Sequence, residues 1–153
     1  MNPGNASVSR SNQHLTGTVI KIVDGDTFDV LTAGNNRIRI RLYGIDSPER
    51  SQDHYRVCKN ALGQFIAGRL VRLVPHGKDR NKRLIAEVFL NGENINLKMI
   101  SNGYAWHFKK YAPDALYAKA EISARSAKRG LWQMAGAVAP WDFRKMKKKK
   151  SNQ

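Results

Sequence analysis

The sequence predicts a single α+β domain in which a small twisted β-barrel carries packed helices. The chain of 153 residues is long enough for one domain with a core, and its hydrophobic content of 41% is ordinary for a globular protein. Runs rich in β-branched residues come first, and strand-like runs mixed with helical segments follow. Five short strands and three helices in this order favour a barrel with helices on its surface.

Five runs have the alternation or the β-branched composition of strands. Asp24-Gly25 and Asn91-Gly92 mark turns at strand ends. In the third run, isoleucine and leucine alternate with arginine, so Arg41 is expected to point away from the core, where a substrate can reach it. The expected strands span 15–23, 27–32, 37–43, 71–74 and 84–90.

Three segments, 56–70, 95–101 and 115–129, are expected to be helical. Apolar residues recur at helical spacing in the first, Asn102-Gly103 is a stop signal after the second, and the third is rich in Ala. Pro48 cannot continue a central strand, so residues 46–55 are expected to form a loop. Asp114 can cap the last helix and Gly130 can end it.

Both ends of the chain differ in composition from the expected domain at 15–143. Residues 1–14 are rich in Asn, Ser and Gly, which predicts a flexible segment. Residues 144–153 contain six Lys or Arg residues and no acid, which predicts a disordered basic tail. Residues 1–13 lack the apolar run of a signal peptide, and no apolar run approaches the length of a membrane span, so no membrane insertion is expected.

The net charge of +15 and the isoelectric point of about 10.3 favour polyanionic partners, nucleic acid first and an anionic membrane surface second. A basic surface that serves only solubility is the alternative. Cys58 is the one cysteine, so an intramolecular disulfide and a thiolate zinc site are both excluded. The four histidines show no metal-ligand spacing.

Acidic residues gather in one part of this basic chain. Six of the twelve lie within 24–53: Asp24, Asp26, Asp29, Asp46, Glu49 and Asp53. Carboxylates repel one another, so such a group most simply holds a cation. Ligand sets made only of oxygen suit a hard cation such as Ca²⁺.

Arginines close to these acids point to an anionic substrate. Hydrolysis of a phosphodiester places negative charge on the phosphoryl oxygens and needs a positioned water with a group that helps to deprotonate it. A guanidinium is always charged and can donate two parallel hydrogen bonds to such oxygens. Arg41 and Arg83 are the candidates for this task, beside Asp26, Asp46 and Glu49.

Each of these residues also has a simpler interpretation. Asp24-Gly25-Asp26 can be only a turn, and Asp46 or Ser47 can be only a helix cap. Arg41 can belong to a solvated strand face, and Arg83 can be an ordinary loop charge. The functional interpretation therefore depends on their joint occurrence in one chain.

Three motifs together resemble the staphylococcal nuclease (thermonuclease) family. They are VDGDT at 23–27, RLYGIDSPE at 41–49 and DRNKRLIA at 79–86. GLW at 130–132 and PWDFR at 140–144 resemble the closing segments of the Gram-negative and plasmid-borne secreted relatives. The resemblance covers about residues 16–144 and implies a five-stranded OB-fold-type β-barrel with three α-helices packed on it.

The resemblance implies a role for each matching position. Asp26 and Asp46 match the carboxylates that bind Ca²⁺, and Ser47 matches the position whose backbone carbonyl is a further metal ligand. Glu49 matches the general base, and Arg41 and Arg83 match the arginines that contact the scissile phosphate. The implied activity is Ca²⁺-dependent, nonspecific hydrolysis of DNA and RNA to 3′-phosphate and 5′-hydroxyl ends.

The chain departs from the family pattern at two substrate-binding positions. Asn81-Lys82 replaces the frequent Tyr-Gly before Arg83, so Lys82 is expected to replace the lost phosphate contact by its charge. Tyr111 lies at or near a nucleotide-contacting tyrosine. Stacking on bases and core packing both stay open for Trp106 and Phe108, whereas Trp132 and Trp141 are expected to be structural.

Two other functions are compatible with the composition. One is a noncatalytic module that binds nucleic acid or peptide, and the other is a basic anchoring protein whose tail is the active part. The complete set of catalytic residue types argues against the first. We expect a monomer that is exported to the periplasm or the medium, because a nuclease harms its own cell and family members are often exported; a cytoplasmic location is the alternative.

Overall fold

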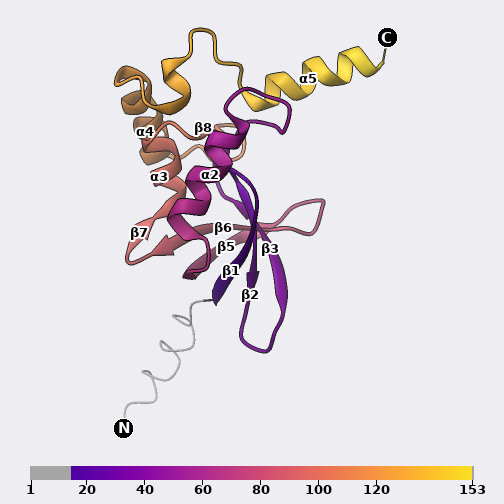
Figure 1. The fold of residues 1–153 in the computed structure, drawn as a ribbon, viewed down its shortest axis with the longest axis vertical. Helices are drawn as coiled ribbons and strands as arrows, with labels where there is room; N and C mark the ends of the chain where they lie inside the picture. Colours follow the sequence, from indigo (N-terminus) through magenta and orange to yellow (C-terminus); the bar gives the residue numbers. More distant parts are fainter. Residues whose placement is uncertain (1–14, 153) are drawn as a thin grey trace.

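The computed structural model describes residues 15–152, so the expected flexible segment 1–14 lies outside the described residues (Figure 1). Five strands form the barrel in the order β3-β2-β1-β5-β6, and a parallel pairing of β3 with β6 closes it. The expected five-stranded barrel is therefore confirmed. The strands are β1 Leu15–Asp24, β2 Thr27–Leu31, β3 Arg37–Leu42, β5 Leu70–Lys78 and β6 Leu84–Leu90.

The barrel interior is filled by the alternate side chains that the strand pattern predicts. Residues such as Phe28, Val30, Ile40 and Leu42 are fully buried. Where β3 meets β6, Ile40 pairs with Leu84 and Arg41 pairs with Ile85. This closure brings the chain that follows Arg83 beside Arg41, although the two arginines are more than forty residues apart in the sequence.

Strand β5 is longer than the expected strand at 71–74. It continues through Pro75 to Lys78, with a register shift between Pro75 and Gly77 where it pairs with β6. Such a bulge accommodates a proline, which cannot donate a ladder hydrogen bond.

The helices lie over one side and one end of the barrel (Figure 1). Helix α2 packs on β1, and α3 packs on α4 and β6. Helix α2 ends earlier than expected, because Gly68 adopts a left-handed φ of 73° before β5 begins. The described helices are α2 Tyr55–Ile66, α3 Ile95–Ser101, α4 Ala115–Ser126, α5 Pro140–Ser151 and the 3₁₀ turn η1 Gly130–Gln133. Short strands β4 Ile45–Asp46, β7 Glu93–Asn94 and β8 Trp106–His107 complete the fold.

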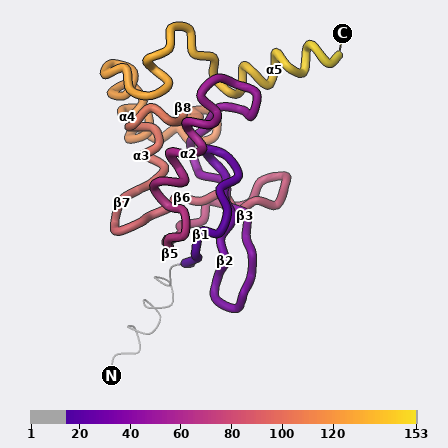
Figure 2. Tube along the Cα trace, in the orientation of Figure 1, coloured from indigo at the N-terminus to yellow at the C-terminus, as the bar shows by residue number. Residues whose placement is uncertain are grey.

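The C-terminal segment differs from the expectation of a disordered tail, because residues 140–151 form α5 and raise the helix count from three to four in the described chain. Pro140 stands at the first helical position, Asp142 in the first turn and lysines in the last turn. These placements suit a helix start and its dipole. In Figure 2 the yellow α5 begins near the loop that follows β4 and extends away from the barrel. None of the helices within 15–152 has the length and apolarity to cross a membrane.

A buried amide joins α3 to the barrel. Asn96 is fully buried, and its side-chain oxygen accepts a hydrogen bond from the N–H of Val88 at 2.9 Å. Its amide nitrogen donates to the carbonyl oxygens of Tyr43 at 2.9 Å and Ala86 at 3.1 Å. One side chain therefore holds the end of β3, the middle of β6 and the first turn of α3 together.

Replacing Asn96 by alanine should lower the free energy of unfolding by about 2–4 kcal/mol, because it leaves buried backbone groups unpaired and opens a cavity. Urea denaturation measures this loss. Asn102→Ala, at the exposed end of the same helix, is the matched control and should change stability by less than about 1 kcal/mol. Equal losses for the two variants would contradict this role for Asn96.

Candidate active site

Asp26 joins the turn between β1 and β2 to the loop that follows β4, and both segments carry acidic residues. It lies in the turn between β1 and β2, and its Oδ2 accepts hydrogen bonds from the Ser47 N–H at 3.0 Å and the Ser47 hydroxyl at 3.1 Å. Its Oδ1 accepts from the Thr27 hydroxyl at 2.9 Å. Gly25 permits this approach, because a Cβ there would lie only 2.8 Å from Ser47 Oγ. The loop after β4 is thereby fixed against the β1–β2 turn.

Arg41 lies between the two carboxylates that the sequence predicts as metal ligands. Its Nη2 is 3.6 Å from Asp26 Oδ2 and 3.5 Å from Asp46 Oδ1. Its Nη1 donates to the Leu42 carbonyl at 2.8 Å, which holds the guanidinium in place. Ile40 and Leu42, its neighbours in β3, are buried in the core, so Arg41 points away from the barrel interior, as the strand alternation predicts. Its side chain is 14% exposed and therefore has limited contact with solvent.

The crowded carboxylates have perturbed acidities. Burial and the adjacent Asp26 charge raise the pKa of Asp24 to about 8. Burial opposes ionisation of Asp26 as well, but Arg41 and several hydrogen bonds more than offset it and lower its pKa. Burial raises the pKa of Asp46 to about 6, against the opposing effect of hydrogen bonds from Arg144. Asp26 therefore holds the most secure negative charge of the three, next to Arg41.

Arg144, at the start of α5, contacts the site, although the sequence placed it in the PWDFR motif and the basic tail and gave it no role in the site. Its Nη2 donates to Asp46 Oδ2 at 2.7 Å, and its Nη1 donates to Glu49 Oε1 at 2.6 Å. No spacing signal connects position 144 with 46 or 49, because almost a hundred residues intervene. The one available signal was the PWDFR motif itself, which places an arginine one helical turn after a proline.

Three contacts join the start of α5 and the residue stretch just before it to neighbouring segments. The Gln52 amide donates to the Val138 carbonyl at 2.9 Å, and the Lys147 ammonium lies 3.4 Å from Ser51 Oγ. Trp141 stacks on Phe108, with ring centroids 5.2 Å apart and an interplanar angle of 8°. The first turns of α5 are therefore attached to both the loop after β4 and the segment after β8.

Among the described residues, Arg83 makes no hydrogen bond or ion pair with Asp26, Asp46 or Glu49, the acids with which the sequence predicts it to act. Its Nε donates to Asp79 Oδ2 at 2.6 Å, so it is held within its own hairpin loop. Arg41 of β3 pairs with Ile85 of β6. Side chains two positions apart on a strand share one face, so Arg83, two residues before Ile85, lies near the same face of the barrel as Arg41. Lys82 is exposed and adopts a left-handed φ of 61°, a conformation that glycine adopts more readily.

The aromatic residues divide into a buried and an exposed set. Trp106 is 3% exposed and packs edge-on against Trp132, so its environment is that of a core residue. Tyr111 is 67% exposed, and its ring meets Phe108 edge-on at 4.9 Å. Tyr111 is therefore accessible to a ligand, whereas Trp106 is not.

The donor set suits a hard cation. Asp26 and Asp46 supply carboxylate oxygens on both sides of one guanidinium, and Ser47 adjoins them. Residues 15–152 contain no cluster of three or more His, Cys, Asp or Glu side chains arranged around a common point, so metal binding here would need backbone or water oxygens as well. The guanidinium of Arg144 already contacts both Asp46 oxygens, so a cation would share or replace that contact.

A closed OB-type barrel with Asp26, Arg41 and Asp46 held together at its surface carries the residue types that hydrolysis of a phosphodiester requires. The family model described as "Staphylococcal nuclease homologue" matches residues 39–134, and the chain belongs to this family. The protein is accordingly a nuclease.

Relatives in bacteria and in a plant are named as endonucleases or nucleases. An "Uncharacterized endonuclease" of Haemophilus influenzae is 39% identical over 138 residues, which cover 90% of this chain and 78% of the relative. Another of Escherichia coli O157:H7 is 36% identical and covers 87% of each chain. A "Staphylococcal-like nuclease" of Arabidopsis thaliana is 33% identical over 73% of this chain and 35% of its own length.

Replacing Asp24 by asparagine should stabilise the protein increasingly as the pH rises. The folded pKa of about 8 lies above the ordinary value of 3.8, so the native state binds the Asp24 proton more tightly and loses stability between pH 4 and pH 8. The asparagine side chain does not ionise, and its oxygen can still accept from the Asp26 N–H. The gain in unfolding free energy at pH 9 should be roughly 2–5 kcal/mol.

Urea denaturation in chelator at pH 5, 7 and 9 measures this gain. Asp53→Asn removes an exposed acid from the loop between β4 and α2 and is the charge-matched control. A gain for Asp24→Asn that does not grow with pH would contradict the assignment.

Proposed function

We propose that the protein is a Ca²⁺-dependent nuclease that hydrolyses DNA and RNA with little sequence preference and leaves 3′-phosphate and 5′-hydroxyl ends. The observation that carries the proposal is the position of Arg41 between Asp26 and Asp46, with Glu49 joined to Asp46 through Arg144. This arrangement brings fixed negative charge for a metal, positive charge for a phosphate and a carboxylate for a water molecule to one outward face of the barrel.

Asp26, Asp46 and the carbonyl of Ser47 would hold the cation. When bound, Ca²⁺ supplies positive charge that offsets the charge of the phosphodiester. Asp26 is suited to this task because its lowered pKa keeps it ionised at neutral pH. Asp46 becomes available as the pH rises above its pKa of about 6.

Arg41 donates hydrogen bonds to the phosphoryl oxygens, whose negative charge grows as water attacks the phosphorus. Glu49 orients that water and accepts its proton. The bond between phosphorus and the 5′ oxygen breaks, the 5′ oxygen gains a proton and the phosphate stays on the 3′ side. Arg83 would supply the second guanidinium on exchanging Asp79 for the substrate phosphate.

Substituting either side chain at the reacting phosphate should abolish most activity. Glu49→Gln should lower the cleavage rate of plasmid DNA by about 10²–10⁴-fold, because the amide cannot accept the proton from water. Arg41→Ala should lower it by roughly 10²–10³-fold through lost stabilisation of the transition state. Initial rates with saturating Ca²⁺ measure both effects.

Arg56→Ala serves as the control, since it removes an exposed charge from α2, and its rate should stay within about twofold of wild type. Binding of an oligonucleotide in chelator should survive in all three variants. Wild-type-like rates for Glu49→Gln would contradict the role of Glu49 as base.

The metal and the direction of cleavage are tested together by end-group analysis. Digestion with Ca²⁺ should yield 5′-hydroxyl ends that a kinase labels directly, while excess chelator should stop the reaction. Products with 5′-phosphates would contradict the proposed bond breakage, and equal rates with Mg²⁺ would contradict the preference for Ca²⁺.

We also propose that the protein acts as a monomer. We place it outside the cytoplasm, because an active nonspecific nuclease would damage the nucleic acid of its own cell. Light scattering of the purified protein and fractionation of the producing cells test these two points separately. A dimer, or activity confined to the cytoplasmic fraction, would contradict the respective point.

A further inference from the structure

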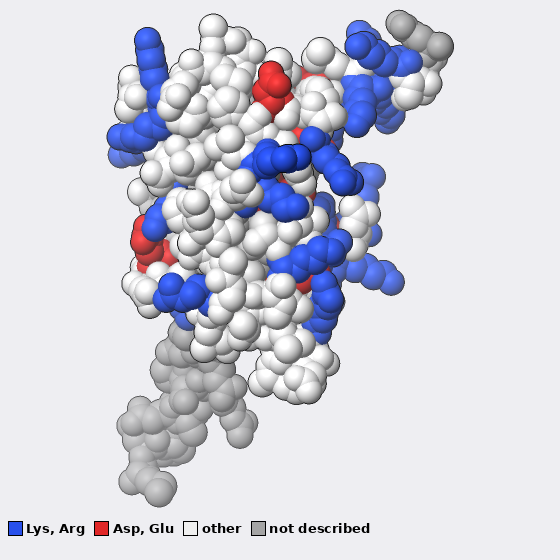
Figure 3. Space-filling view, viewed as in Figure 1, with Lys and Arg blue, Asp and Glu red and all other residues white. Residues whose placement is uncertain are grey.

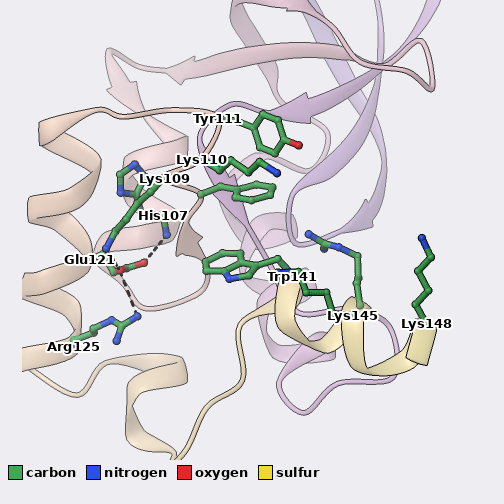
Figure 4. Close-up of a pocket in the computed structure, with 11 residues that line it drawn as sticks. His107, Lys109, Lys110, Tyr111, Glu121, Arg125, Trp141, Lys145 and Lys148 are labelled. Atoms are coloured by element: carbon green, nitrogen blue, oxygen red, sulfur yellow. Dashed lines mark hydrogen bonds and ion pairs between the residues drawn. The ribbon is translucent and has the colours of Figure 1, made fainter. Parts of the chain in front are cut away.

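A groove of about 530 Å³ lies beside the candidate active site, between the segment that follows β8 and helix α5. Figure 4 shows Lys110 and Tyr111 on one wall and Trp141, Lys145 and Lys148 on the other. Glu121 and Arg125 of α4 close one end. Neither the family roles carried by the three motifs nor the catalytic residues proposed above use the α5 wall.

Positive charge dominates the groove. Its one acidic residue, Glu121, already has Lys109 at 3.8 Å, Arg125 at 3.4 Å and the His107 N–H at 2.6 Å. Within the described chain, Lys145 and Lys148 have no carboxylate partner. Space-filling atoms of Lys and Arg gather at the α5 end of the molecule (Figure 3). The cationic lining residues are Lys109, Lys110, Arg125, Arg144, Lys145 and Lys148.

Aromatic rings lie among these cations. The stacked pair of Phe108 and Trp141 belongs to the lining, and the exposed Tyr111 ring stands at the edge of Phe108. Proteins that bind single strands combine cations that follow the phosphates with aromatic rings on which bases stack. A paired duplex would not offer the faces of its bases to Tyr111.

Arg144 connects the groove with the carboxylates. It lines the groove and also donates hydrogen bonds to Asp46 and Glu49. A strand lying in the groove therefore reaches the side chains that act on the scissile phosphate without leaving the protein surface.

We propose that helix α5 forms the second wall of the substrate-binding surface, where Lys145 and Lys148 contact the phosphates of an unpaired nucleic-acid strand next to the cleaved phosphodiester. Tyr111, the tyrosine that the family resemblance already places against a nucleotide, lies on the opposite wall and stacks on a base of that strand. The inference rests on the proposed function for the identity of the polymer. It assigns a substrate-binding role to α5, which the sequence presents as a basic tail.

Helix α5 contains its own control. Lys145 and Lys148 are three residues apart and line the groove, so they share one face of the helix. Lys147 and Lys150 are also three residues apart but lie on the opposite side, where the Lys147 ammonium meets Ser51 Oγ. The double variants K145A/K148A and K147A/K150A therefore remove equal charge from one helix at different faces.

Fluorescence anisotropy of a labelled DNA strand of about 12 nucleotides, in excess chelator and over a salt series, tests the proposal on the full chain. K145A/K148A should weaken binding about tenfold near 0.1 M salt and lower the salt slope by roughly 1.4, the value for two phosphate contacts on a single strand. K147A/K150A should weaken binding by less than about threefold. Tyr111→Leu, on the other wall, should weaken binding by about tenfold with an unchanged salt slope.

Equal losses for the two lysine pairs would overturn the proposal, because the binding would then follow net charge alone. A Tyr111→Leu variant that binds like wild type would overturn the stacking. If the wild-type protein bound a duplex of the same length more tightly than the single strand, the choice of an unpaired strand would be overturned. The same holds if K145A/K148A lost binding to anionic phospholipid vesicles and kept its binding to DNA. These measurements require no cleavage. If the protein gave the expected binding results but did not cleave nucleic acid, the proposed Ca²⁺-dependent chemistry would be refuted and the proposed binding role of the groove would be retained.

Discussion

The contact between Asp26 and Ser47 determines how the site is assembled. It joins a turn of the barrel to a loop that is 21 residues away in the sequence, and it does so through a buried negative charge. A buried carboxylate is costly unless it is paired and hydrogen-bonded, and Arg41 together with Ser47 and Thr27 satisfies that requirement. The position of Asp46 follows, because it precedes Ser47 directly. Hydrogen bonds from Ser47 and Thr27 and the guanidinium groups of Arg41 and Arg144 thus hold the acidic group together.

Much of the barrel and the central part of the site could be predicted from the sequence because they depend on local patterns. The alternation in β3 determines which face Arg41 takes, and the turn signal at Asp24-Gly25 determines where Asp26 lies. Once the barrel closes, these residues need no further information to meet.

The parts that could not be predicted depend on contacts between distant segments. Arg83 pairs with Asp79 of its own loop rather than with the acids of the site. The sequence contains both sets of carboxylates and does not indicate which of them the guanidinium contacts. The lysine-rich end has the composition of a solvated tail. Contacts from Gln52 to Val138 and from Phe108 to Trp141 hold its helix in place, and the spacing of residues within the segment does not predict them. Composition describes the solvation of a segment but not the surface against which it docks.

The docking of α5 also has a consequence for the order in which the molecule is completed. Synthesis proceeds from the N-terminus, so the carboxylates of Asp46 and Glu49 leave the ribosome long before Arg144 is joined to the chain. During that interval the barrel can close through β6, while its acidic loop still lacks one of its two positive neighbours. The arrangement of charges around Asp46 and Glu49 is therefore complete only after α5 has formed and docked.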